Sequence, residues 1–129
     1  MREQPQGHAL LACARQVLRD EILPALPAER KHALLMVMNA MSIAERQLRN
    51  GDAPEAQERV RLRGLVDSGD AGLAEGNRML ARQLRNGAAD PGAPRREALL
   101  AHLRATTRQR LAESNPKALP KAPDARAPV

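Results

Sequence analysis

The stretch AERKHALLMVMNAMSIAERQLRN, residues 28–50, decides the fold class. Its apolar residues recur at intervals of three and four, which places them on one face of an α-helix. The residues with this spacing are Leu34, Val37, Met38, Met41 and Leu48, and Leu35, Met36 and Ile43 widen the face. Pro27 suits the first turn of such a helix, and Asn50-Gly51 suits its end. We expect this segment to be the central helix of a helical bundle.

The composition of the whole chain also favours an all-α fold. Its 129 residues contain no Phe, Tyr or Trp, whereas Ala, Leu and Arg, which are strong helix formers, are abundant. The missing aromatic residues exclude modules that stack nucleic-acid bases on aromatic rings and cages that bind quaternary ammonium groups. They also make a β-sandwich improbable. No apolar run approaches the ~18 residues of a membrane-spanning helix.

The same apolar spacing predicts four more helices, over residues 8–23, from residue 52, and over 73–86 and 95–113. We therefore expect a compact bundle of about five helices over residues 1–115, followed by a disordered, basic, Pro-rich tail at 116–129. The hexapeptide RQLRNG occurs twice, at 46–51 and 82–87. Because a cationic last turn followed by Asn-Gly ends any helix well, we interpret this repeat as two similar helix ends.

The sequence contains no pattern typical of catalysis, metal binding or cofactor binding. His8, His32 and His102 lack the spacing of metal ligands, and we expect them at the surface or at helix ends. Glu45 and Glu29 are interpreted as isolated helical carboxylates. Cys13 has small apolar neighbours and is expected to be buried, and a single cysteine fits a reducing compartment such as the cytoplasm. We expect a cytoplasmic protein that is not an enzyme and holds no metal or cofactor.

Basic residues concentrate near the C-terminus, where residues 94–129 carry five of the six net positive charges. A basic face is predicted on the last helix, made of Arg95, Arg96, Arg104, Arg108 and Arg110. The plainest interpretation is a solvated surface. The alternatives are binding to an acidic protein, to the phosphates of a cofactor such as coenzyme A, or to a nucleic-acid backbone.

Four polar or helix-ending positions are candidates for interaction or structure. Asn39 and Arg46 are two helical turns apart and therefore share a face of the helix over residues 28–50. Asn39 lies among apolar residues, so we expect it to be buried and to fix helix packing. Asn115-Pro116 is expected to end the last helix. Contact with a partner protein is the alternative for both pairs.

Three segments resemble a small uncharacterised bacterial family whose members occur beside, or fused to, aminoglycoside-phosphotransferase-like kinases and acyl-CoA dehydrogenases. The segments are LRDEILPALP at 18–27, NAMSI at 39–43 with RQL and GD at 46–48 and 51–52, and LAESNPKAL at 111–119. Relatives have an Arg-Glu pair where this chain has Arg46-Gln47. The resemblance implies a non-catalytic accessory protein whose partner is one of these two enzymes. Homo-oligomerisation is also possible, and a small basic nucleic-acid-binding protein is the alternative function.

Overall fold

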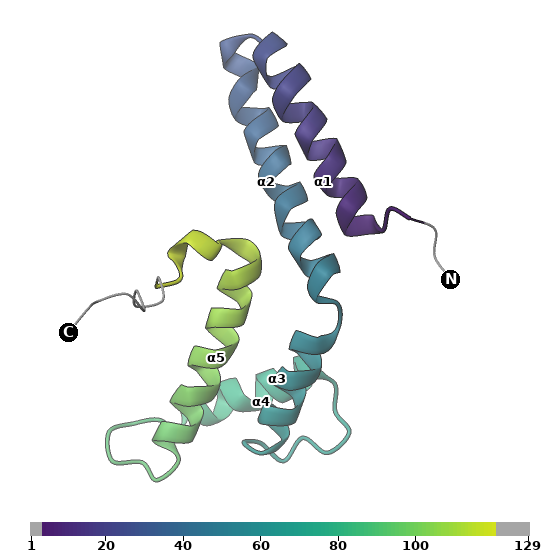
Figure 1. Ribbon diagram of the computed structural model, residues 1–129. Helices are drawn as coiled ribbons and strands as arrows, with labels where there is room; N and C mark the ends of the chain where they lie inside the picture. Colours follow the sequence, from purple (N-terminus) through teal and green to yellow (C-terminus); the bar gives the residue numbers. More distant parts are fainter. Residues whose placement is uncertain (1–3, 121–129) are drawn as a thin grey trace, which may run out of the picture. The chain divides into compact units, whose positions relative to one another are not determined.

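The structure is a computed structural model that describes residues 4–120. It confirms the all-α class, since five α-helices and no strand occur in this part of the chain (Figure 1). The helices are α1 (Gly7–Val17), α2 (Ala28–Asn50), α3 (Ala53–Arg63), α4 (Leu73–Arg85) and α5 (Arg96–Ser114). No described helix combines the length and the apolar character that crossing a membrane requires.

The first predicted helix differs most from the structure. It is regular only to Val17, and the chain then forms a π-helical turn at Leu18–Ile22 and a 3-10 turn at Leu23–Ala25. Pro24 contributes to the change, since proline has no N–H for an intrahelical bond. At the start of α3, the Asp52 side chain makes no capping hydrogen bond, although aspartate is a favoured residue at this position.

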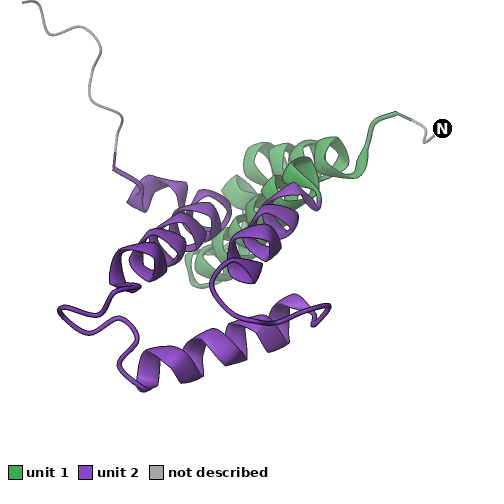
Figure 2. Cartoon of the chain, turned by 90° about the horizontal axis from the view of Figure 1, so that it is seen from below, with its two compact units in different colours: residues 1–51 green, residues 52–129 purple. Residues whose placement is uncertain are grey.

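The chain divides into two compact units, residues 1–51 and 52–129 (Figure 2). In the first unit, α1 and α2 pack side by side as an antiparallel hairpin. Among residues 4–51, Met38 and Glu45 are the only ones that are buried. The hairpin therefore has very little apolar interior.

The second unit contains a small aliphatic core built from α3, α4 and α5. Its buried residues are Leu62, Val66, Leu80 and Leu99. Helix α2 contributes none of them, contrary to the expectation that it is the central helix. Gly76 lets α4 approach α3 closely, since a Cβ at this position would lie 2.6 Å from Leu62 Cδ2.

Both copies of the repeated hexapeptide end a helix, as predicted. Gly51 follows α2 with φ of 59°, and Gly87 follows α4 with φ of 86°, conformations that glycine adopts at low cost. Helix α5 ends at Ser114 and is followed by a 3-10 turn at Pro116–Ala118. This turn lies inside the segment expected to be disordered. Residues 121–129, the rest of that predicted tail, lie outside the described residues.

Candidate functional site

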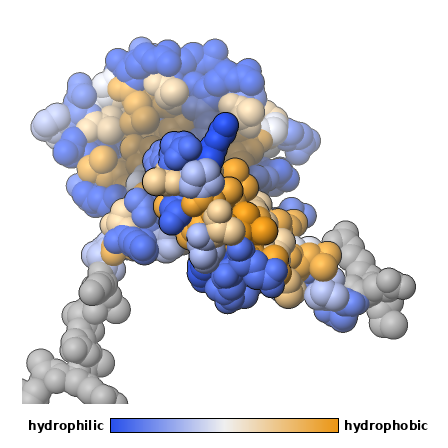
Figure 3. Space-filling model, turned by 90° about the horizontal axis from the view of Figure 1, so that it is seen from above, coloured by the Kyte–Doolittle hydropathy of each residue, from blue (hydrophilic) through white to orange (hydrophobic). Residues whose placement is uncertain are grey.

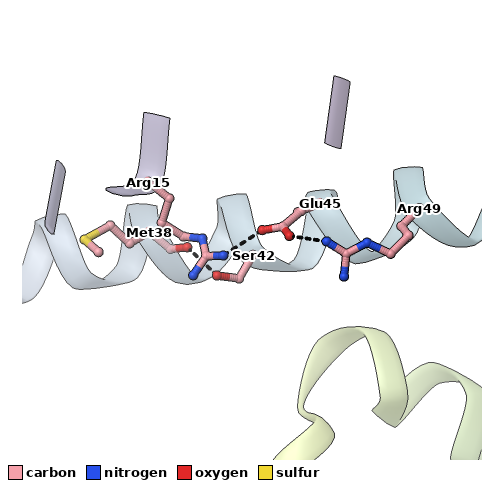
Figure 4. Close-up of polar contacts among 5 residues, drawn as sticks. All are labelled: Arg15, Met38, Ser42, Glu45 and Arg49. Atoms are coloured by element: carbon pink, nitrogen blue, oxygen red, sulfur yellow. Dashed lines mark hydrogen bonds and ion pairs between the residues drawn. The ribbon is translucent and has the colours of Figure 1, made fainter. Parts of the chain in front are cut away.

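Glu45 lies between the two helices of the hairpin, where it pairs with one arginine from each helix (Figure 4). Its Oε2 accepts a bond of 2.7 Å from Arg15 Nη2, and its Oε1 accepts one of 2.6 Å from Arg49 Nη2. The glutamate side chain is 9% exposed, whereas that of Arg49 is 58% exposed. The carboxylate therefore joins α1 to α2 inside the hairpin.

The hydrogen bond from Arg15 is the largest effect on Glu45 and lowers the pKa of its carboxyl, against the opposing effect of burial. The interpretation of Glu45 as isolated is wrong. Two signals in the sequence pointed to the pairing. Glu45 continues the inward-facing series of Leu34, Met38 and Met41, and Arg49 follows it by one helical turn.

The four candidate polar positions are divided between the two units. Asn39 is exposed on α2, so the expectation that it is buried is wrong, while Arg46 is half-buried. Asn115 ends α5, and Pro116 begins the following 3-10 turn, which confirms the predicted helix end. The first pair belongs to residues 1–51 and the second to residues 52–129.

Each helix of the hairpin carries a second apolar series that its partner helix does not cover. On α1 the series is Leu10, Ala14 and Val17, and on α2 it is Ala33, Val37, Ala44 and Leu48. The four larger side chains are 47–56% exposed. Figure 3 shows apolar residues at the molecular surface.

The two series approach each other at the end of the hairpin where α1 begins. A Cβ on Gly7, the first residue of α1 and three positions before Leu10, would lie 3.4 Å from Leu48 Cδ1. We call the seven residues of the two series the hairpin face. None of them is charged.

The five arginines of the predicted basic face are not equivalent. Arg95 donates to the Leu65 carbonyl, and Arg96 donates to the Ala89 carbonyl. Arg110 Nη2 lies 3.4 Å from the carboxylate oxygen of Glu58. Arg104 and Arg108 are exposed. Three of the five therefore make contacts within the second unit, although Arg95 and Arg110 are also exposed.

A buried polar cluster lies beside the core of the second unit. Glu58 is 3% exposed and accepts a 3.0 Å bond from Asn77 Nδ2 in addition to its contact with Arg110. His102 is 3% exposed, and its Nδ1 is buried with no hydrogen-bond partner. The Thr106 hydroxyl, one turn further along α5, is buried and unpartnered as well.

The expectation for His102 is therefore wrong, because this histidine is neither at the surface nor at a helix end. His102, Thr106 and Arg110 follow one another at intervals of four, which places all three on one side of α5. That spacing was a signal for the cluster in the sequence. Burial is the largest effect on the imidazole and lowers its pKa, and the nearby Arg61 acts in the same direction.

Cys13 is exposed, which corrects the expectation that it is buried. Among residues 4–120, no three His, Cys, Asp or Glu side chains gather where they could hold a metal ion.

One of three comparisons with known proteins found a match, to a family described as a domain of unknown function. No match was found among curated proteins or among solved structures. A family model, described as a domain of unknown function, matches residues 24–118. The match includes helices α2 to α5 and covers well over half of the chain. The chain therefore belongs to the DUF6285 family.

Proposed function

We propose that this protein is a non-catalytic accessory domain that binds a partner protein through the hairpin face. The supporting observation is that Leu10, Val17, Val37 and Leu48 are half-exposed on two helices that pack against each other. Exposed apolar surfaces are typical of sites that bind other proteins. An amphipathic helix of a partner can lay its apolar face against such a surface.

The proposed partner is an aminoglycoside-phosphotransferase-like kinase or an acyl-CoA dehydrogenase. This choice rests on the resemblance of LRDEILPALP, NAMSI and LAESNPKAL to a family found beside these enzymes. The proposed location is the cytoplasm, which the single free Cys13 supports.

The test is recovery of the partner from the native host with a tagged full-length chain. We expect mass spectrometry to identify one of the two enzyme classes. Val37→Glu should reduce its recovery by about tenfold or more, since a charge in the centre of an apolar interface costs at least ~1.4 kcal/mol. If neither enzyme class is recovered while both are expressed, the proposed partner is wrong.

Met36→Glu is the matched control. Met36 is 56% exposed and Val37 is 52% exposed, so both substitutions place the same charge at a similarly accessible position on α2. Met36 lies outside the hairpin face, about 100° around the helix from Val37. Equal losses from the two variants would show that the hairpin face is not the binding surface.

Nucleic-acid binding is the alternative function and has less support from the contacts. Arg95, Arg96 and Arg110 make internal contacts, which leaves Arg104 and Arg108 of the predicted set free to meet phosphates. Titration of duplex DNA at two salt concentrations separates the two functions. Binding that weakens steeply with salt would favour this alternative.

A further inference from the structure

The buried polar cluster of the second unit has a role that protein binding through the hairpin does not explain. Its imidazole belongs to α5, the helix that carries Leu99, the most buried core residue at 0% exposure. His102 lies three positions after Leu99 and therefore on the same side of the helix. A change in the charge of this ring thus occurs beside the contacts that hold α5 in place.

The charges around the ring oppose its protonation. On α3, Arg61 disfavours a second positive charge and Glu58 favours it. On α5 itself, Arg110 disfavours it. Helix α4 contributes the neutral Asn77, whose amide bonds to Glu58. Glu58 is already engaged by Asn77 and Arg110, so it is poorly placed to neutralise a new cation.

A protonated ring would also need hydrogen-bond acceptors for two N–H groups. Nδ1 is buried and has no acceptor in the present arrangement. The ring can meet this need by reaching water, and this requires the side of α5 that carries Leu99 and His102 to move away from the core. Proton uptake and close packing of α5 are therefore opposed.

We infer that His102 is a proton sensor that keeps α5 packed on α3 and α4 while its imidazole is neutral. When the ring takes up a proton from solvent, α5 loosens from the other two helices. The unfolded chain binds this proton below about pH 6.5, whereas folding lowers the pKa of the buried ring. The stability of the second unit therefore falls as the pH drops below about 6.5.

The test is urea unfolding of the full chain at about pH 7.5, 6.5 and 5.5, monitored by circular dichroism. Histidines titrate in this range, and most carboxylates do not. We expect the urea midpoint of the wild type to fall across the range and that of His102→Gln to stay nearly constant. His32→Gln is the matched control, because His32 is exposed and its replacement should leave the wild-type pH dependence intact.

Equal loss of stability in the wild type and His102→Gln would overturn the inference. An NMR titration of the wild-type histidine resonances decides the question even if His102→Gln does not fold. The His102 resonance should titrate below pH 6.5, and the α5 amide resonances should change with the same midpoint. A midpoint at or above 6.5, or α5 amides that do not respond, would contradict a sensor at this position.

Discussion

Removal of the Arg15 guanidinium tests the internal link of the hairpin. Arg15→Leu keeps most of the aliphatic stem and deletes the group that bonds to Glu45 Oε2 at 2.7 Å. Arg49 remains as a partner of the carboxylate, but its side chain is 58% exposed, so water screens that pair strongly. The variant therefore leaves a nearly buried carboxylate with one weak partner.

The expected loss follows from the exposure of the two side chains. A hydrogen bond to a charged group contributes about 1.5–3 kcal/mol. Since the Arg15 side chain is 24% exposed and that of Glu45 is 9% exposed, we expect a loss near the lower limit, about 1.5 kcal/mol. With a urea dependence of about 1.5 kcal/mol per molar, the urea midpoint should fall by about 1 M.

The ion pair of Arg15 and Glu45 also determines how the stability lost in Arg15→Leu depends on pH. Folding lowers the pKa of Glu45, so the folded chain holds fewer protons than the unfolded chain in mildly acidic solution. The pair contributes fully to the free energy of unfolding above 4.5, the ordinary pKa of a glutamate carboxyl. This contribution is lost as the pH falls through the pKa that Glu45 has in the folded chain. The difference between wild type and Arg15→Leu should therefore shrink in acid.

The assay is urea unfolding by circular dichroism at about pH 7 and about pH 2.5, on either side of the carboxyl titration. Hydrogen exchange at neutral pH shows whether the loss is confined to α1 and α2. Arg19→Leu is the control, since Arg19 is exposed and its replacement removes the same charge from the same unit; we expect a change within about 0.5 kcal/mol. Equal effects of the two substitutions at pH 7, or a penalty for Arg15→Leu that persists in acid, would refute the reasoning.

Three further substitutions, with Gly72→Ala as a control, test the packing and the backbone by the same unfolding assay. Gly76→Ala should destabilise by about 1 kcal/mol, because a clash of 2.6 Å with the buried Leu62 outweighs the helix propensity that alanine gains; an unchanged midpoint would show that Leu62 can move aside. Leu99→Ala should cost about 2–5 kcal/mol, since this side chain is fully buried. Gly51→Ala should cost about 1–2 kcal/mol because the φ of Gly51 is 59°. Gly72→Ala should be nearly neutral, because a Cβ there also meets no atom within 4 Å and the φ of Gly72 is −64°.

The helices could be predicted from the sequence because their signals are local. The apolar spacing within 28–50, the two Asn-Gly ends and Pro116 each act on neighbouring backbone, and the observed helix ends agree with them to within one residue. The irregular turn at Leu18–Ile22 could not be found in this way. The π-helical turn changes the backbone hydrogen bonds but approximately keeps the spacing of the apolar residues. The apolar spacing in the sequence therefore does not reveal the turn.

The partners that the buried glutamates find on other helices could not be predicted, because they come from distant parts of the chain. Glu45 meets Arg15 across 30 residues, and Glu58 meets Arg110 across 52. The register of Glu45 and its spacing from Arg49 indicate a pair within α2, but nothing near Glu45 in the sequence indicates Arg15. The converse error concerns Asn39, where apolar neighbours in sequence suggested burial although the side chain points to solvent.

The apolar character of α2 connects its sequence with the proposed binding role. A helix that is apolar on most sides normally lies inside a protein, and this pattern led to the expectation of a central helix. Within the first unit, however, α1 covers one side of α2 and leaves Val37 and Leu48 half-exposed. The ion pair of Arg15 and Glu45 holds α1 on one side of α2. Helix α1 therefore does not cover the side of α2 that carries Val37 and Leu48. Helix α2 therefore has the sequence of a buried helix, although its own hairpin covers it on one side. The apolar side that α1 leaves uncovered is suited to contact with a helix of a partner protein.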